Sequence, residues 1–103
     1  MLNKITEDLL YNMTMLNEKD KKIIQSLSKK YKVKRVLLFG SSLDQTSSSR
    51  DIDIAVEGIS PKEFFKYYGD LLLNLSKPID VVDLSGSSKF ISLIKKEGEL
   101  IYG

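Results

Sequence analysis

A run of four apolar residues at 36–39, Val-Leu-Leu-Phe, ends abruptly at Gly40. A short, continuous apolar run is typical of a strand that is covered on both faces, because neither face shows polar residues. The glycine that ends it indicates a sharp turn, since glycine adopts backbone conformations that are costly for other residues. We therefore expect an inner strand that stops at a tight bend.

Acidic residues follow this bend in two further strand-like segments. Asp51 and Asp53 are two positions apart, so in a strand their side chains share one face. Asp80 stands in a third such run at 79–84. Two like charges about 4 Å apart repel by roughly 4 kcal/mol at an effective dielectric near 20, so converging carboxylates would need a cation to offset them. Carboxylate oxygens suit Mg²⁺ or Mn²⁺, which commonly join them to a substrate phosphate.

The bend itself has the chemistry of a phosphate-binding turn. Gly40 has no side chain and lets the backbone approach a phosphate closely, while Ser41 offers a hydroxyl and an N–H. Alone, a Gly-Ser pair is usually only a turn, and an Asp-x-Asp pair can be the solvent face of an edge strand. Their joint order favours a site for a metal-bound nucleotide.

These segments resemble the minimal nucleotidyltransferases of the DNA polymerase β-like superfamily over about residues 20–103. The resemblance rests on the sequences at 38–41, 51–56 and 79–82. It implies an α/β (α+β) fold, with a small mixed sheet of three or four strands flanked by helices. The apolar spacing of residues 2–16 predicts an added N-terminal helix. It also implies a triphosphate at Gly40 and Ser41, and divalent cations held by three catalytic and metal-binding residues, Asp51, Asp53 and Asp80.

The activity that the resemblance implies is transfer of a nucleoside monophosphate, commonly AMP from ATP, to an acceptor hydroxyl. The implied partner is a small all-helical HEPN protein, often a toxin that such proteins neutralise. The chain departs from the family at Ser42, where many members carry a basic residue, and it lacks their second glycine. We therefore expect Ser42 and Arg50 to contribute to phosphate binding, with Lys34 or Arg35 as alternative sources of positive charge.

Composition limits the other possibilities. The chain has 103 residues with no Cys and no His, which excludes disulfides, thiolate zinc sites and imidazole bases and leaves carboxylates as catalysts. The formal net charge is only +2, so a nucleic-acid-binding domain is a weaker alternative despite lysines between residues 19 and 35. We read those lysines as a solvated helix face. Without a signal peptide or a long apolar run, we expect a cytoplasmic protein with no membrane partner.

The remaining pattern predicts one domain over residues 1–103, with a helix over 1–17 as a candidate interface and a core over 18–103. Asn17 is expected to cap a helix over 18–31, and Ser60 with Pro61 to start another. In that helix one broad arc is expected to be buried, and Leu73 lies outside it and is expected to be exposed. The buried arc comprises Phe64, Phe65, Tyr67, Tyr68, Leu71, Leu72 and Leu75.

A last amphipathic helix is predicted over 87–97, with Phe90 on its apolar side and Gly98 ending it. Asp83 faces away from Asp80 in a regular strand, and we read it as structural. Two functional classes stay open. One is an enzyme. The other is a binding module that acts as an antitoxin or regulator, with acids that are vestigial or merely bind nucleotide. It is motivated by size, because about 100 residues leave little room for acceptor recognition without a protein partner or a second copy of the chain.

Overall fold

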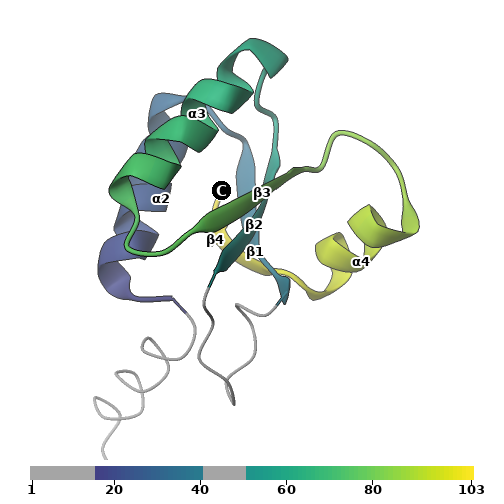
Figure 1. Cartoon of the computed structure of the whole chain (residues 1–103). Helices are drawn as coiled ribbons and strands as arrows, with labels where there is room; N and C mark the ends of the chain where they lie inside the picture. The colour runs from purple at the N-terminus through teal and green to yellow at the C-terminus, as the bar shows by residue number, and fades with distance from the viewer. Residues whose placement is uncertain (1–15, 41–50) are drawn as a thin grey trace, which may run out of the picture.

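The computed structural model describes residues 16–40 and 51–103, which form a four-stranded sheet with helices on both faces (Figure 1). The predicted N-terminal helix lies almost entirely outside these residues. The elements are, in chain order, α2 (Glu18–Lys30), β1 (Arg35–Leu38), β2 (Ile52–Glu57), α3 (Pro61–Asn74), β3 (Ile79–Asp83), α4 (Lys89–Glu97) and β4 (Glu99–Tyr102).

The sheet is mixed, as expected. Its strand order is β3-β2-β1-β4, with β1 antiparallel to both β2 and β4. Strand β3 runs parallel to β2, and the crossover between them is α3. The fourth strand, β4, follows Gly98 directly and adds an edge that the sequence pattern did not identify.

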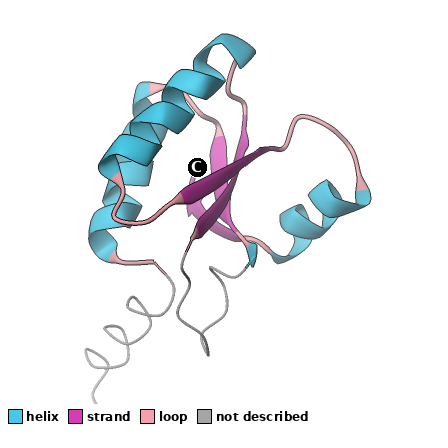
Figure 2. Cartoon of the chain, in the orientation of Figure 1, coloured by secondary structure: helices cyan, strands magenta, loops and turns pink. Residues whose placement is uncertain are grey.

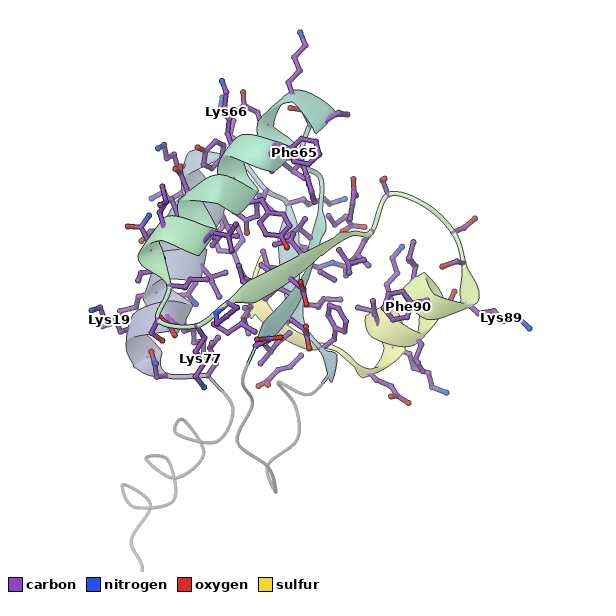
Figure 3. The ribbon with its side chains drawn as sticks, viewed as in Figure 1. Lys19, Phe65, Lys66, Lys77, Lys89 and Phe90 are labelled. Carbon is purple, nitrogen blue, oxygen red and sulfur yellow. The ribbon has the colours of Figure 1, made fainter. Side chains whose placement is uncertain are left out.

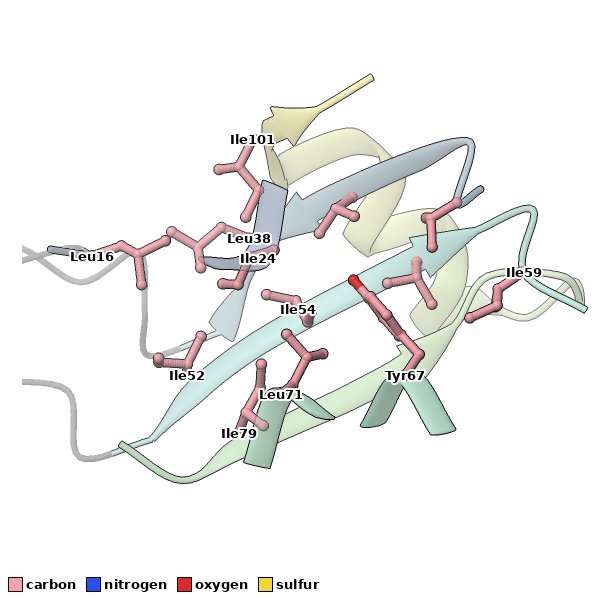
Figure 4. Packing of buried hydrophobic residues seen from close by; sticks show 13 residues of the cluster. Leu16, Ile24, Leu38, Ile52, Ile54, Ile59, Tyr67, Leu71, Ile79 and Ile101 are labelled. Carbon is pink, nitrogen blue, oxygen red and sulfur yellow. The ribbon is translucent and has the colours of Figure 1, made fainter. Parts of the chain in front are cut away.

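Helices α2 and α3 cover one face of the sheet, and α4 covers the other (Figure 2). The larger core lies under α2 and α3, where Ile24, Ile54, Tyr67 and Leu71 are fully buried (Figure 4). A smaller cluster of Leu37, Ala55, Leu84 and Ile94 packs beneath α4. Alternate residues of β1 and β2 thus face two cores, which is why the central residues of both strands, 36–38 and 54–56, are apolar on both faces.

The helix starts follow the predicted signals. Asn17 caps α2, with its Oδ1 accepting from the N–H of Asp20 at 2.7 Å. Asp20 is itself buried and accepts from Ser76 N at 3.1 Å and from Ser76 Oγ at 2.5 Å. Ser60 occupies the N-cap position of α3, but its hydroxyl makes no capping hydrogen bond. The local signal for this helix start is therefore Pro61, whose fixed φ suits the first helical position. The Asp20 bonds tie the start of α2 to the segment that leads into β3.

The predicted buried arc of α3 was too wide. Tyr67 and Leu71 are buried, whereas Phe65 is 79% exposed and Leu72 is 53% exposed. Leu73 is exposed, as expected. The reason is that, within the described ranges, α3 packs mainly against α2 and the edge strand β3, and no described element lies above its outer side. None of the helices in the described ranges has the length and apolar content needed to cross a membrane.

Candidate nucleotide site

Two of the three predicted acids lie side by side. Strands β2 and β3 pair in parallel with Asp53 opposite Asp80, and neighbouring strands are about 4.8 Å apart. Ile52 and Ile79, one position earlier in each strand, enter the core beneath α2 and α3. By alternation, both carboxylates therefore lie on the opposite face, which is the face that carries α4.

The predicted turn at Gly40 lies against the carboxylate of Asp53. The N–H of Phe39 donates to the carbonyl oxygen of Asp53 at 3.0 Å, which brings the end of β1 beside Asp53. Gly40 has a φ of +65°, and a Cβ added there would lie 2.7 Å from Asp53 Oδ2. The backbone at Gly40 and the Asp53 carboxylate are therefore packed closely enough to require glycine. The side chain of Asp53 is half-buried, and that of Asp80 is exposed.

Asp51 directly precedes β2 and is exposed. Within the described ranges, no three His, Cys, Asp or Glu side chains lie close enough together to hold a metal ion between them. The three-aspartate centre thus stays a prediction, while the pairing of Asp53 with Asp80 is part of the sheet register. Three predicted phosphate ligands, Ser41, Ser42 and Arg50, lie outside the described residues.

Two basic residues offered as alternatives are placed elsewhere. Arg35 pairs with Glu57 through Nε and Oε2 at 3.1 Å, at the end of β1 opposite to Gly40. Arg35 precedes Gly40 by five positions, roughly 16 Å along an extended chain. The N–H of Lys34 donates to the carbonyl oxygen of Glu57 at 2.8 Å, at the same end of the strand pair. Both residues therefore stand at the end of β1 opposite to Gly40, and the described structure does not bring them to the turn.

Asp83 has the structural role that we expected. Its Oδ1 accepts from Ser85 N at 2.9 Å, which stabilises the turn after β3. The lysine-rich segment lies on the outer side of α2 and the turn behind it, where Lys30 pairs with Asp70 at 3.5 Å. These lysines are on the face of the sheet away from Asp53 and Asp80, which agrees with a solvated helix face.

One contact to β3 could not be read from the sequence. Tyr68 of α3 donates its hydroxyl to the carbonyl oxygen of Ile79 at 3.0 Å, one residue before Asp80. Burial raises the pKa of the Tyr68 hydroxyl, and the negative charge of Asp80 raises it further. The sequence pattern alone favours a core or interface position for this tyrosine. Only the packing of α3 against the sheet edge reveals that Tyr68 holds the strand segment bearing Asp80.

A pocket of about 450 Å³ opens next to Gly40, between the end of β1 and α4. Its walls include Phe39 and Phe90, whose rings meet edge to face with centroids 5.9 Å apart. Phe90 was expected on the buried side of α4, but it is 52% exposed because α4 leaves this gap above β1. Sequence analysis did not identify this pocket.

A small mixed sheet with a glycine turn and a register-matched acidic pair defines a nucleotidyltransferase-type domain. The chain belongs to the polymerase β nucleotidyltransferase family, whose model matches residues 21–103. Solved structures that it resembles include a toxin–antitoxin structure with AMP-PNP, an MntA–HepT toxin–antitoxin structure and a complex of a HEPN toxin with an MNT antitoxin. The predicted family and the polymerase β-like fold are thereby confirmed.

Three of these structures illustrate the likeness. A toxin–antitoxin structure with AMP-PNP is 26% identical, with a TM-score of 0.66 over 81% of this chain and 73% of the other. A single-substitution variant of an MntA toxin–antitoxin complex is 30% identical, with a TM-score of 0.60 over 85% and 73%. A complex of a tri-AMPylated HEPN toxin from Shewanella oneidensis with its MNT antitoxin is 24% identical, with a TM-score of 0.62 over 82% and 70%. No curated protein matches the sequence.

Proposed function

We propose that the chain transfers AMP from ATP to a hydroxyl group of a HEPN-type protein partner and thereby acts as its antitoxin. The observation that supports this proposal best is the pairing of Asp53 with Asp80 beside the Gly40 turn. The donor and the partner are inferred from similar structures, one with AMP-PNP and one with an AMPylated HEPN toxin.

The acidic pair fits a divalent cation. Asp53 and Asp80, with Asp51 just upstream, would hold Mg²⁺ or Mn²⁺ through oxygen atoms alone, the donor type that these ions prefer. Side-by-side carboxylates on adjacent strands repel each other until a cation is bound. Bound there, the ion would neutralise the charge that develops on the transferring phosphoryl group.

The reaction that we propose is a displacement at the α-phosphorus. The acceptor oxygen forms a bond to this phosphorus, the bond to the bridging oxygen of the β-phosphate breaks, and pyrophosphate leaves. We assign the proton of the acceptor hydroxyl to the Asp80 carboxylate, the more exposed of the pair. Gly40, with Ser41, Ser42 and Arg50, would hold the β- and γ-phosphates through backbone, hydroxyl and guanidinium groups.

A second function, neutralisation by binding alone, is favoured by an apolar surface away from the acids. We call this surface the α3 patch, and it comprises Phe65, Leu72 and Leu73, with Gly69 between them. A Cβ at Gly69 would meet no atom within 4 Å, so the middle of the patch is open. Exposed apolar side chains grouped on one helix often mark a protein interface.

Label transfer tests the proposed activity. The chain is incubated with Mg²⁺, a HEPN-type protein and ATP labelled at the α-phosphate, with γ-labelled ATP in a parallel reaction. Label from the α-position should appear on the partner, and label from the γ-position should not. Asp53→Asn should reduce the transfer rate at least about a hundredfold, as expected when charge stabilisation at a phosphoryl group is lost.

Asp83→Asn is the matched control, because Asp83 is an exposed aspartate of the same strand as Asp80 that serves the following turn. It should transfer label at the rate of the unsubstituted protein. If the partner is neutralised equally well by the Asp53→Asn variant while transfer is lost, binding alone suffices and the second function is the correct one. Equal transfer by Asp53→Asn and the unsubstituted protein would contradict the proposed chemistry.

A further inference from the structure

The pocket beside Gly40 continues the candidate site across the sheet. Asp80, Asp53 and Phe39 follow one another on the adjacent strands β3, β2 and β1, because Phe39 N bonds Asp53 O and Asp53 pairs with Asp80. By alternation, all three side chains lie on the face that carries α4. Two carboxylates are thus followed, one strand further on, by the apolar pocket.

The pocket has the size and composition of a small-ligand site. Its volume of about 450 Å³ falls within the usual range for such pockets. Phe90 and Leu93, each about half exposed, form its outer wall, and Ile94 closes it from inside. Half-exposed apolar side chains around a hollow leave an aromatic face open to a flat ligand. In Figure 3, Phe90 lies on α4, apart from Phe65 on α3.

Two features of the pocket restrict the ligand. Gly40 belongs to both the pocket and the proposed phosphate turn, so one molecule can have an anionic part at the turn and an apolar part in the pocket. Glu97 is the charged residue in the pocket lining, and a carboxylate accepts hydrogen bonds. A base with an exocyclic amino group, such as adenine, supplies the matching donor.

We infer that this pocket receives the base of the nucleotide, with Phe90 stacking on the ring and Glu97 accepting from its amino group. This inference rests on the proposed function and adds a determinant of base specificity to it. Phosphates would extend from the acidic pair toward Gly40, while the base lies against Phe39 and Phe90.

The test compares ATP with inorganic triphosphate, which carries the phosphates without a base. Affinities are measured calorimetrically with Mg²⁺ for the full chain, for Phe90→Ala and for Phe65→Ala. Phe90→Ala should weaken ATP binding about tenfold, a loss typical of removing a stacking side chain, and leave triphosphate binding unchanged. Phe65→Ala, the same truncation at an exposed phenylalanine of α3, should change neither.

Base choice is tested with ITP, in which a carbonyl replaces the amino group of adenine. The unsubstituted protein should bind ATP several-fold more tightly than ITP, and Glu97→Gln should reduce this difference, because an amide can donate to the carbonyl. Equal affinity for ATP and ITP in the unsubstituted protein would overturn the assignment of Glu97.

The other outcomes separate this inference from the proposed function. If Phe90→Ala binds ATP as tightly as the unsubstituted protein, the base lies elsewhere and the inference fails, while nucleotide binding stands. If Phe90→Ala instead weakens only binding of the HEPN-type protein, the pocket belongs to the partner interface and the inference fails. If neither ATP nor triphosphate binds the unsubstituted protein, the proposed function fails together with the inference.

Discussion

Gly40 is the residue whose identity the candidate site constrains most closely. It combines a positive φ with a contact that leaves no space for a side chain, since an added Cβ would lie 2.7 Å from Asp53 Oδ2. The atom in the way is the carboxylate that we propose as a metal ligand. A substitution at Gly40 would therefore move that carboxylate as well as the turn.

Gly40→Ala should remove label transfer and lower the free energy of unfolding by about 1 to 2 kcal/mol, because alanine is strained at this φ. Gly69→Ala is the matched control. Gly69 lies inside α3 with open space around its Cα, so alanine there should stabilise the protein by about 0.5 to 1 kcal/mol. Urea unfolding measures both, and a Gly40→Ala variant with normal stability and transfer would contradict the packing described.

The site residues that the sequence could identify were those with a local pattern. Asp53 and Asp80 each stand in a recognisable strand, and the parallel register of β2 and β3 then makes them neighbours. Tyr68 acts through a contact with Ile79 in the next element, and Phe90 through a contact with Phe39, far away in the chain. Both contacts depend on how elements pack together, and no local pattern encodes that packing. Arg35, one of the alternative sources of charge for the turn, pairs with Glu57 at the opposite end of β1, and the sequence gives no sign of that partner.

Among the elements, α3 joins the sheet to the helical layer that covers one of its faces. It connects β2 to β3 and presents Tyr67 to α2, where Tyr67 Oη lies 2.8 Å from Ser28 Oγ in the buried core. Burial raises the pKa of Tyr67 to about 12 from its ordinary value of 10.0, although the bond with Ser28 lowers it. The protonated hydroxyl is therefore favoured by the folded state.

This shift has a defined consequence for stability. The unfolded chain releases the Tyr67 proton near pH 10, while the folded chain holds it until about pH 12. The protonated Tyr67 hydroxyl contributes fully to the free energy of unfolding below pH 10. This contribution is lost as the pH rises from about 10 to 12, by up to about 3 kcal/mol. Tyr67→Phe should flatten this decline and cost about 1 kcal/mol at neutral pH.

Urea unfolding between about pH 8 and pH 11.5 measures how stability falls with pH in the unsubstituted protein and in Tyr67→Phe. Tyr31→Phe serves as a comparison, because the bond from the Tyr31 hydroxyl to Asp70 raises the pKa of that tyrosine to about 12 at the surface. Parallel stability curves for the unsubstituted and Tyr67→Phe proteins would show that burial of this hydroxyl does not control its ionisation.

The elements themselves were largely predictable. Asn17 and Pro61 mark the helix starts, and α2 ends within a residue of the predicted end. Strand β4 was missed because its four residues owe their strand conformation to pairing with β1. The outer side of α3 was assigned to the core because periodicity shows which residues share an arc without showing how much of that arc a neighbour covers.

At the scale of the whole molecule, the sheet separates two surfaces. The acidic pair and the pocket lie on the α4 face, whereas the α3 patch lies beyond the opposite face. This arrangement allows a partner to be held by α3 without contacting the proposed nucleotide site. Binding and transfer should therefore be separable by substitution.

Leu73→Lys tests this separation. Leu73 is 85% exposed, so a lysine there should leave folding unchanged and place a charge in the α3 patch. Affinity for the HEPN-type protein should fall at least about tenfold, while ATP affinity is unchanged. Leu100→Lys, at an exposed leucine of β4, is the control and should affect neither. A Leu73→Lys variant with full partner affinity would exclude the patch from the interface.

The central claim is that Asp53 and Asp80 form one metal-dependent nucleotide site. Electron paramagnetic resonance of Mn²⁺ measures it most directly, because the signal of the free ion falls when the protein binds it. The unsubstituted protein and Asp83→Asn should bind Mn²⁺ more tightly when ATP is present, after subtraction of binding by ATP alone. The double variant Asp53→Asn/Asp80→Asn should show no such binding. Equal Mn²⁺ uptake by the double variant and the unsubstituted protein would contradict the account.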